Sequence, residues 1–186
     1  MLEENKNFNH LKVHTQYSIC EGAIKIDELA EYCKSKKVKS IGLSDSNNLC
    51  GALEFSEKIS KVGTHPIIGT QINLNIANTF GKISLYATSE TGYKNLTKLS
   101  SISYLKNDVT TEPFCSLKDL NENSEDLVLL TGSYRNFFGQ LFYKNKLKDF
   151  EQILNTLKSS FKDRIYIEIQ RHNEYQEKNF ENYLLN

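Results

Sequence analysis

His10-Leu-Lys-Val-His-Thr15 alternates polar and apolar residues, and it opens the part of the chain whose pattern decides the fold. Because side chains of an extended chain alternate between two faces, this pattern predicts a strand over residues 11–15. After a turn at Gly22, apolar residues recur at helical spacing over residues 26–33, which predicts a helix. A short apolar segment over residues 40–45 predicts the next strand. Together these elements predict a β-α-β unit.

The same alternation of strands and helices continues along the chain. It predicts an α/β fold with a parallel sheet, open or closed into a barrel. The chain contains no Gly/Ser linker, so we expect one domain over residues 1–186 without an internal boundary. Since no helix stop signal occurs near Asn186, we expect this domain to be incomplete at its C-terminus by at least one strand. Further strands are expected over residues 66–76, 83–87, 127–130 and 165–169, and further helices over residues 49–59, 93–102, 147–157 and from 174 onward, with a loop around Pro113 and a short segment around Phe137.

Composition narrows the possible classes of protein. The chain has 186 residues, 23 Lys and Arg, and 23 Asp and Glu, so its formal net charge of zero gives no bulk attraction to DNA or to anionic membranes. No apolar run is long enough to span a bilayer and no secretory signal is present, so we expect a cytoplasmic protein that does not contact membranes. The four cysteines form no C-x-x-C pair and are expected to be reduced and mostly buried.

Several polar residues are expected to gather at one end of the sheet, where parallel α/β folds carry their functional groups. The two-residue period of a strand places His10, Lys12 and His14 on one face. Such a face is typical of a metal site in which a cation has replaced one ligand. The other polar residues at strand ends are Glu21, Asp45, Ser46, Gln71, Arg171 and His172.

Five ordered segments carry a resemblance to a known family. The first three are His10-Leu-Lys-Val-His-Thr-Gln-Tyr-Ser-Ile-Cys-Glu-Gly22, Leu43-Ser-Asp-Ser-Asn-Asn-Leu-Cys-Gly51 and Pro66-Ile-Ile-Gly-Thr-Gln71. Thr91-Gly-Tyr-Lys-Asn-Leu-Thr-Lys-Leu-Ser100 and Tyr166-Ile-Glu-Ile-Gln-Arg-His172 follow. In order and spacing these segments resemble the PHP (polymerase and histidinol phosphatase) domain of bacterial DNA polymerase III alpha subunits. The resemblance implies a PHP-type distorted (β/α) barrel, and its fourth segment favours the polymerase branch over free-standing phosphatases.

The resemblance also implies which residues belong to the site. An intact PHP site holds up to three divalent metals on His and carboxylate ligands and cleaves phosphoesters. His14, Glu21, Asp45 and His172 keep the family's residue types. Lys12, Ser46 and Gln71 replace two histidines and a carboxylate, and Lys82 aligns loosely with another histidine. The family's last Asp-x-His pair would lie beyond residue 186.

These replacements predict a degenerate site. An ammonium group has no lone pair and repels cations, so no metal is expected, although His14, Glu21 and His172 are the ligands to expect if Zn²⁺ or Mn²⁺ did bind. Our hypothesis is that Lys12, with Lys82 as a second candidate, supplies the charge that a metal once did and pairs with Glu21 and Asp45. Asp45 could equally be the N-cap of the following helix, and His14 an ordinary structural histidine.

For function, the resemblance implies the N-terminal PHP portion of a polymerase III alpha subunit that acts in DNA replication. The whole polypeptide would be a Mg²⁺-dependent DNA-directed DNA polymerase that contacts DNA and the other holoenzyme subunits, whereas this portion alone would be inactive. The domain would serve as scaffold and as a docking surface for a proofreading exonuclease. The alternative is a residual metal-dependent phosphoesterase or 3′-5′ exonuclease.

Overall fold

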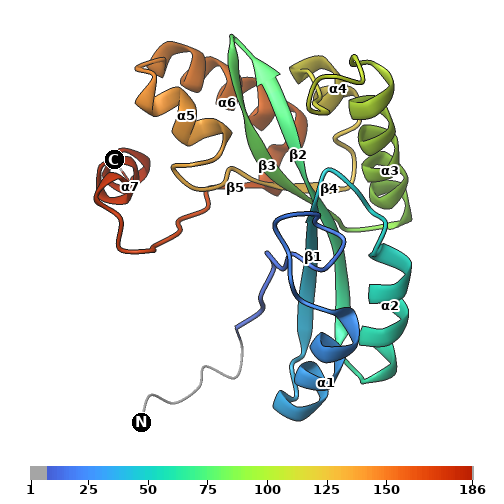
Figure 1. Ribbon diagram of the computed structural model, residues 1–186. Coiled ribbons are helices and arrows are strands. Elements are labelled where there is room, and N and C mark those ends of the chain that lie inside the picture. The colour runs from blue at the N-terminus through green and yellow to red at the C-terminus, as the bar shows by residue number, and fades with distance from the viewer. Residues whose placement is uncertain (1–7, 186) are drawn as a thin grey trace. The chain divides into compact units, whose positions relative to one another are not determined.

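The computed structural model describes residues 8–185, which form two compact units. The first unit extends to Thr70 and the second begins at Gln71. Helices and strands lie in both units, and they are labelled in Figure 1. The described residues include no helix with the length and apolar character needed to cross a membrane.

The first unit is built from two helices and two strands. They are α1 (Ile26–Lys36), β1 (Ser40–Ser46), α2 (Ala52–Lys61) and the first half of β2 (His65–Ile76). Apolar residues at helical spacing on α1 and α2 face each other and β1, and each buried side chain of this kind stabilises the fold by roughly 1.5–3 kcal/mol. The fully buried members of this core are Ile26, Cys33, Leu43, Phe55 and Ile59.

The segment predicted as a first strand lies beside β1 but is not a regular strand. The amide of Gly42 donates to the carbonyl of His10 at 2.7 Å, and that of Ser44 donates to Val13 at 2.9 Å. Three residues separate the two acceptors but only two residues separate the donors, so the ladder is interrupted. The prediction of a regular strand over residues 11–15 was therefore wrong, and only isolated parallel bridges form there, at Val13 and Thr15.

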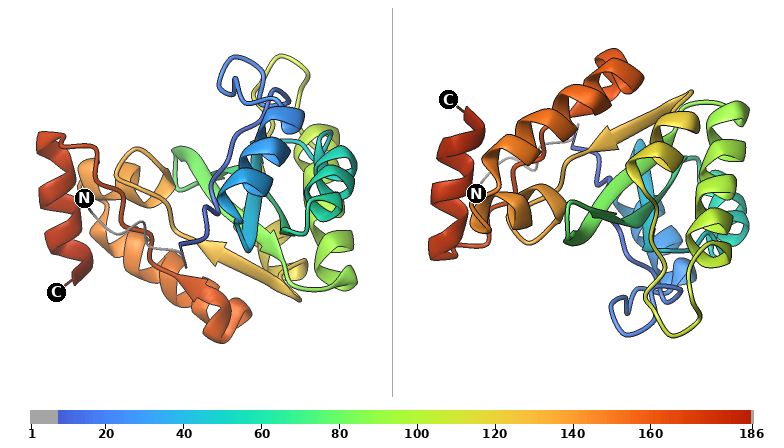
Figure 2. Two further views of the ribbon diagram at one scale, coloured as in Figure 1. Left: turned by 90° about the horizontal axis from the view of Figure 1, so that it is seen from below. Right: turned by 90° about the horizontal axis from the view of Figure 1, so that it is seen from above.

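The second unit contains the rest of the sheet and most of the helices. Phe137, Phe138 and Phe150 pack edge to face in its core, between α5, α6 and the sheet. Figure 2 shows α5 and α6 side by side from two directions. The elements are β3 (Thr79–Ala87), α3 (Glu90–Leu105), α4 (Leu117–Glu122), β4 (Leu127–Leu130), α5 (Phe137–Tyr143), α6 (Leu147–Phe161), a 3₁₀ turn (Lys162–Arg164), β5 (Ile165–Tyr166) and α7 (Tyr175–Leu185).

The α/β class is confirmed, but the sheet is mixed and not wholly parallel. Its five strands follow the order β1-β2-β3-β4-β5, and they do not close into a barrel. Ala77 and Asn78, with φ of 51° and 55°, form the two-residue turn of a hairpin between β2 and β3. β3 and β4 are also antiparallel, whereas β4 and β5 are parallel. The prediction of a parallel sheet was wrong because a two-residue turn between β2 and β3 leaves no room for the crossover that parallel pairing requires, and because β4 pairs antiparallel with β3 although α3 and α4 lie between them.

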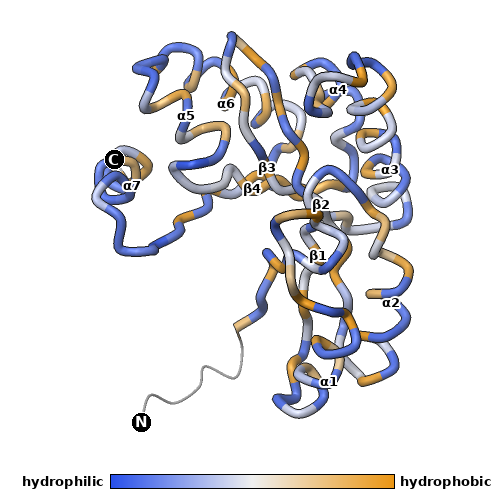
Figure 3. The backbone as a smooth tube through the Cα atoms, viewed as in Figure 1, coloured by the Kyte–Doolittle hydropathy of each residue, from blue (hydrophilic) through white to orange (hydrophobic). Residues whose placement is uncertain are grey.

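The last predicted strand is also shorter than its sequence suggests. β5 covers only Ile165 and Tyr166, although the alternation of apolar residues continues to Ile169. Its neighbour β4 is entirely apolar, as Figure 3 shows, but it has only four residues. The chain turns after it at Gly132, where φ is 82°. The ladder therefore has no partner strand beyond Tyr166.

All four cysteines are thiols. Cys33 and Cys115 are buried, whereas Cys20 and Cys50 are exposed, so half of them rather than most behave as core residues. The Cys115 thiol donates a hydrogen bond to the carbonyl of Leu99 at 3.4 Å. Burial raises the pKa of Cys115 to about 12 and also raises the pKa of Cys33, because a thiolate is poorly solvated there.

Candidate functional site

A hollow of about 650 Å³ in the first unit brings several of the predicted site residues together. His10, Lys12 and His14 all line it, as expected for residues that alternate along an extended segment. Glu21 lines the same hollow. The apolar residues of its lining are Val13, Ala23, Ile24, Leu29 and Ile41, and Gly22, Glu28 and Tyr32 complete it. We call the four polar residues named above the polar wall of the site and the five apolar residues its apolar floor.

Asp45 is buried beside this wall, and both oxygens of its carboxylate accept hydrogen bonds. The backbone amide of Thr15 donates to Oδ1 at 2.6 Å, and the Thr15 hydroxyl donates to Oδ2 at 2.7 Å. The Ser18 hydroxyl donates to Oδ1 at 2.7 Å. Each such charge-assisted bond contributes about 1.5–3 kcal/mol. Asp45 thus holds the loop after His14 against β1, and its partners are Thr15 and Ser18 instead of the expected Lys12.

The alternative role of Asp45 as a helix N-cap was also wrong. Asp45 belongs to β1, and α2 begins seven residues later, at Ala52, with Gly51 at its N-cap position. The carboxylate nevertheless lies near this end of α2, because a Cβ placed on Gly51 would lie 3.3 Å from Asp45 Oδ2. A negative charge at this point interacts favourably with the positive, N-terminal end of the dipole of α2.

Ser18 fixes the tautomer of His14. Its hydroxyl hydrogen is directed to Asp45, and its oxygen accepts from the Ser46 amide at 3.1 Å. His14 Nδ1 lies 3.2 Å from the same oxygen. Because the single hydroxyl hydrogen is already used, Nδ1 must be the donor in this contact. Neutral His14 therefore carries its lone pair on Nε2.

Glu21 connects His14 with Ser46 on the exposed side of the site. One carboxylate oxygen lies 4.0 Å from His14 Nδ1, and the same oxygen accepts a hydrogen bond from the Ser46 hydroxyl. Ser46 stands where the resemblance expects a histidine ligand. Its hydroxyl is thus directed at a carboxylate that would otherwise be a metal ligand.

These residues do not fit a multi-metal centre. Asp45 already accepts three hydrogen bonds in a buried position, and Lys12 brings an ammonium group into the hollow. Within residues 8–185, no group of three or more His, Cys, Asp or Glu side chains has an arrangement that could hold a metal ion. The polar wall can position its side chains and can bind through hydrogen bonds, but it lacks the donor set that divalent metals require.

The remaining predicted site residues belong to the second unit. Gln71 is buried in β2, and its amide nitrogen donates to the Ser84 hydroxyl at 3.1 Å. Lys82 is half-buried on β3. His172 and Arg171 are exposed, and the His172 backbone amide donates to the Glu177 carboxylate at 2.7 Å. Gln71 therefore behaves as a neutral sheet residue.

Sequence reasoning missed a polar network that braces the first unit. The Tyr17 hydroxyl donates to Glu54 at 2.7 Å, and Lys58 contacts Glu54 at 2.8 Å and Asp27 at 2.5 Å. The hydrogen bonds to Asp27 and Glu54 raise the pKa of Lys58 to about 12, and those from Lys58 and Tyr17 lower the pKa of Glu54. The four-residue spacing of Glu54 and Lys58 was the only signal of this network in the sequence.

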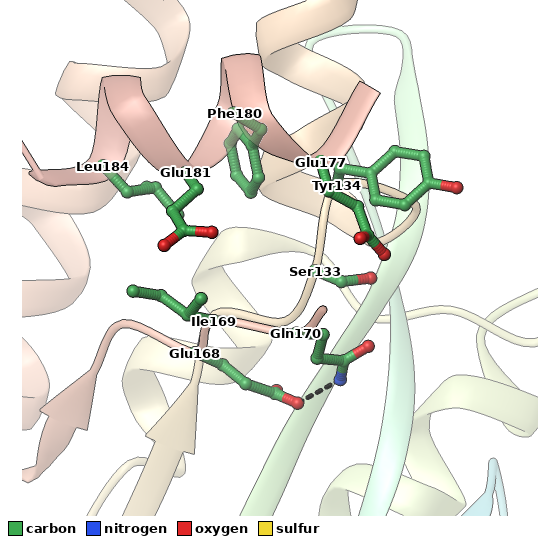
Figure 4. A pocket seen from close by; sticks show the side chains of 9 residues that line it. All are labelled: Ser133, Tyr134, Glu168, Ile169, Gln170, Glu177, Phe180, Glu181 and Leu184. Carbon is green, nitrogen blue, oxygen red and sulfur yellow. Dashed lines mark hydrogen bonds between the residues drawn. The ribbon is translucent and has the colours of Figure 1, made fainter. Parts of the chain in front are cut away.

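A small cavity in the second unit offers no ligand site. Figure 4 shows the residues that line it, some of them on α7, such as Phe180, and others below α7, such as Ser133 and Glu168. Its volume of about 10 Å³ has room for about one water molecule. Nearby, Glu174 binds Arg135 and Tyr134, and the Arg135 guanidinium lowers the pKa of Glu174. These contacts anchor the start of α7.

Comparison with known proteins identifies close relatives of the sequence. The chain is 36% identical over 177 residues to the DNA polymerase III subunit alpha of Caulobacter vibrioides, covering 91% of this chain and 16% of that protein. It is 37% identical over 166 residues to the protein of the same name from Rickettsia bellii, covering 89% of this chain and 14% of the relative. The chain thus spans about one sixth of the length of these curated relatives.

Two further comparisons are more distant. The DNA polymerase III subunit alpha of Aquifex aeolicus is 31% identical over 185 residues. A solved structure from Bifidobacterium adolescentis, provisionally named a metal-dependent phosphoesterase, matches with a TM-score of 0.39 and 15% identity over 51% of this chain and 34% of that one. That likeness is too partial to support an argument about function. The family model of the PHP domain matches residues 10–172, from the first histidine of the hollow to the exposed His172, and the chain therefore belongs to the PHP domain family.

Proposed function

We propose that this chain is the N-terminal PHP portion of a bacterial DNA polymerase III alpha subunit and that it acts in DNA replication in the cytoplasm. The proposal is supported by the relatives of that name, which match about nine tenths of the chain. Template-directed DNA synthesis, its Mg²⁺ and its contacts with DNA would belong to the whole polypeptide. The 186 residues would form one domain of it, and they would not polymerise DNA alone.

We further propose that the metal site of this domain is degenerate. The observation that carries this proposal is the buried Asp45 carboxylate, which is occupied by Thr15 and Ser18. Lys12, Ser46 and Gln71 stand at positions where the family has ligands. His14, Glu21, Asp45 and His172 would then be vestigial site residues with structural roles, and no catalytic residue would remain.

A domain that has lost catalysis can persist as a binding surface. We propose that its partners are other subunits of the polymerase III holoenzyme, the proofreading exonuclease in particular. The open hollow of the first unit supports this, because its apolar floor beside a polar wall is typical of protein-binding surfaces. Mixing the chain with the purified exonuclease subunit from the same bacterium is expected to give a complex in sedimentation velocity, and two separate species would contradict the docking role.

The degenerate site is tested by metal analysis and by activity. The chain is dialysed against Zn²⁺ or Mn²⁺, desalted, and examined by elemental mass spectrometry and by hydrolysis of bis(p-nitrophenyl) phosphate. We expect neither stoichiometric metal nor hydrolysis above the metal-only control. The proposal of a degenerate site would be wrong if the chain retained one equivalent or more of metal and showed hydrolysis that is lost in His14→Ala. The similarity to the polymerase subunits would not be affected.

A residual metal-dependent phosphoesterase or 3′-5′ exonuclease is the second candidate. It is favoured by one observation, that His14 and Glu21 still line the same hollow. With His172 they are the residues that would bind Zn²⁺ or Mn²⁺ in that case. The same hydrolysis assay, repeated with a 3′-labelled single-stranded DNA, distinguishes this candidate from the scaffold.

A further inference from the structure

Exposed lysines gather at one end of the first unit. The turn after α1 and the turn after α2 lie side by side there, because the Thr64 hydroxyl donates to the Val38 carbonyl at 2.8 Å and the His65 amide donates to the Lys39 carbonyl at 2.9 Å. Figure 1 shows the starts of β1 and β2 together at the lower end of this unit. Five exposed lysines lie on or beside these turns, and we call them the basic patch: Lys34, Lys36, Lys37, Lys39 and Lys61.

The basic patch has few acidic neighbours along the chain. No Asp or Glu occurs between Glu31 and Asp45, nor between Glu57 and Glu90. Lys58 is not counted in the patch, because two carboxylates already bind it. Even if Glu31 and Glu57 each offset one lysine a turn further along their helix, a surplus of three positive charges remains. The neutral charge of the whole chain therefore conceals a separation of charge within this unit.

The stability of the two helices accounts for only part of the basic patch. Lys34, Lys36 and Lys61 lie in the last turns of α1 and α2, where a cation interacts favourably with the negative end of the helix dipole. Lys39 lies beyond α1. Lys37 has a φ of 52°, a left-handed conformation that glycine adopts at lower energetic cost at the end of a helix. The lysines at positions 37 and 39 are therefore not explained by the helices.

A cluster of lysines without aromatic side chains suits the phosphate backbone of a nucleic-acid duplex. Ammonium groups bind phosphates as point charges and require no particular base sequence. Binding of single strands relies on aromatic side chains that stack on unpaired bases, and the basic patch contains none. The patch also contains no arginine for bidentate contacts with guanine. Its chemistry therefore fits the backbone of a duplex.

We propose that the basic patch binds the phosphate backbone of double-stranded DNA without sequence preference. The choice of DNA rests on the proposed function, in which the whole polypeptide contacts DNA, and this portion contributes one of those contacts. The patch extends from residue 34 to residue 61, so it lies within the chain and not at either end of the sequence. None of its five lysines lines the hollow of the candidate site.

The first test measures binding of the 186-residue chain to a short labelled duplex by fluorescence anisotropy. Between about 50 and 200 mM salt, the logarithm of the association constant is expected to fall against the logarithm of the salt concentration with a slope of about −4, because each phosphate contact releases counterions. Combined replacement of three patch lysines is expected to weaken binding at least tenfold and to reduce the magnitude of this slope by about 3. The substitutions are Lys34→Gln, Lys37→Gln and Lys39→Gln.

The matched control removes the same amount of charge from the second unit. It combines Lys98→Gln, Lys144→Gln and Lys158→Gln, at positions that are exposed. Because the two triple variants have the same net charge, a difference between them reports the location of the lysines and not the total charge. The control is expected to bind the duplex within about threefold of the original chain, since distant exposed charges are screened by salt.

A third variant keeps the charge of the basic patch. Arginine at positions 34, 37 and 39 should bind the duplex like the original chain, because each substitution retains a cation. An original chain that does not bind the duplex at about 50 mM salt, or two glutamine variants that bind it equally, overturns the proposal. A patch that binds poly-glutamate but not DNA also overturns it, since the partner is then an acidic protein. Circular dichroism establishes that the variants are folded.

The complex with the exonuclease subunit separates this inference from the proposed function. The glutamine variant of the basic patch is expected to form that complex in sedimentation velocity as the original chain does, since the hollow is unchanged. If the original chain forms the complex but does not bind the duplex, the DNA contact alone is wrong. If it binds the duplex through the basic patch but forms no complex, the docking role is wrong and the DNA contact is supported.

Discussion

Three hydrogen-bond donors from Thr15 and Ser18 converge on the buried carboxylate of Asp45, and this arrangement defines what the residue can do. A buried carboxylate that already accepts three hydrogen bonds has little lone-pair capacity left for a cation. The same hydroxyl of Ser18 also orders His14 and the Ser46 amide. At this position hydrogen bonds perform the ordering that ligand bonds would perform in a metal site.

Asp45→Asn is expected to destabilise the fold by about 3 kcal/mol, because the amide nitrogen would face a donor and leave buried groups without partners. Urea denaturation followed by circular dichroism measures this loss. Glu57→Gln, at an exposed position on α2, is the control and should change the free energy of unfolding by less than about 0.5 kcal/mol. A loss from Asp45→Asn as small as that of the control would contradict the structural role.

Lys12→His combined with Ser46→His is expected to raise Zn²⁺ affinity at least tenfold, because two imidazoles would join His14 and Glu21 around the hollow. Isothermal titration calorimetry measures the change. The matched control is Lys39→His with Ser56→His, which places the same residue types elsewhere in the first unit. Equal affinities in the two double variants would show that the lost ligands are not the reason for weak binding.

The sequence anticipated some of these residues better than others. The alternation of His10, Lys12 and His14 correctly predicted that they line one hollow, since that depends only on local geometry. The partners of Asp45 could not be predicted in this way. Thr15 and Ser18 reach it across 30 and 27 residues of sequence, and only the folded loop brings them there.

At the scale of elements, the Tyr17–Glu54–Lys58 network joins a loop to α2 and makes stability depend on pH. The pKa of Glu54 is lowered below its ordinary value of 4.5 by hydrogen bonds from Lys58 and Tyr17. A carboxyl group whose pKa is lower in the folded state stabilises the fold above its unfolded-state pKa, and this contribution is lost as the pH falls through the folded-state pKa.

Glu54→Gln is therefore expected to destabilise the fold more at pH 7 than at pH 3, because the advantage of a carboxylate over a neutral group shrinks as the pH falls toward the lowered pKa. Urea midpoints at the two pH values measure the difference. Glu57→Gln, one turn along the same helix, should show the same small effect at both. A loss from Glu54→Gln that does not depend on pH would show that the carboxylate charge contributes nothing.

Strands and helices with a strong pattern were predicted, and those that depend on distant partners were not. β1, β4 and the helices α1, α3 and α6 follow from apolar period alone. α4 was missed because it has only six residues, although Ser116 and Asp119 form the capping box that marks its start. β5 was overestimated because its length is set by β4, which ends first.

For the whole molecule, the sequence motifs identified the family, whereas closure of the sheet could not be inferred from them. The strand order ends at β5, and β3 runs antiparallel to both of its neighbours, to β2 through the hairpin and to β4 across α3 and α4. The turn at Ala77-Asn78 contains no glycine, so its sequence is only a weak signal for a hairpin. That weak signal is the reason a parallel sheet was expected.

Treatment with a chelator tests whether a bound metal contributes to the stability of the whole chain. If the proposed degenerate site holds no metal, EDTA is expected to leave the midpoint of thermal unfolding of the chain unchanged. A metal present at one hundred times its dissociation constant would contribute about 2.7 kcal/mol, which corresponds to a fall of about 5–10 °C on chelation. Calorimetry with and without EDTA resolves a change of that size, and such a fall would show that a metal contributes to the fold.

The two buried thiols, Cys33 and Cys115, lie in different units of the chain. A thiol that is both enclosed and held in its protonated form reacts with alkylating reagents only while its surroundings are open. Their modification rates, resolved by peptide mass spectrometry, therefore report how often each unit opens. Equal rates at rising urea would mean that the units open in a single event, and different rates would rank their local stabilities.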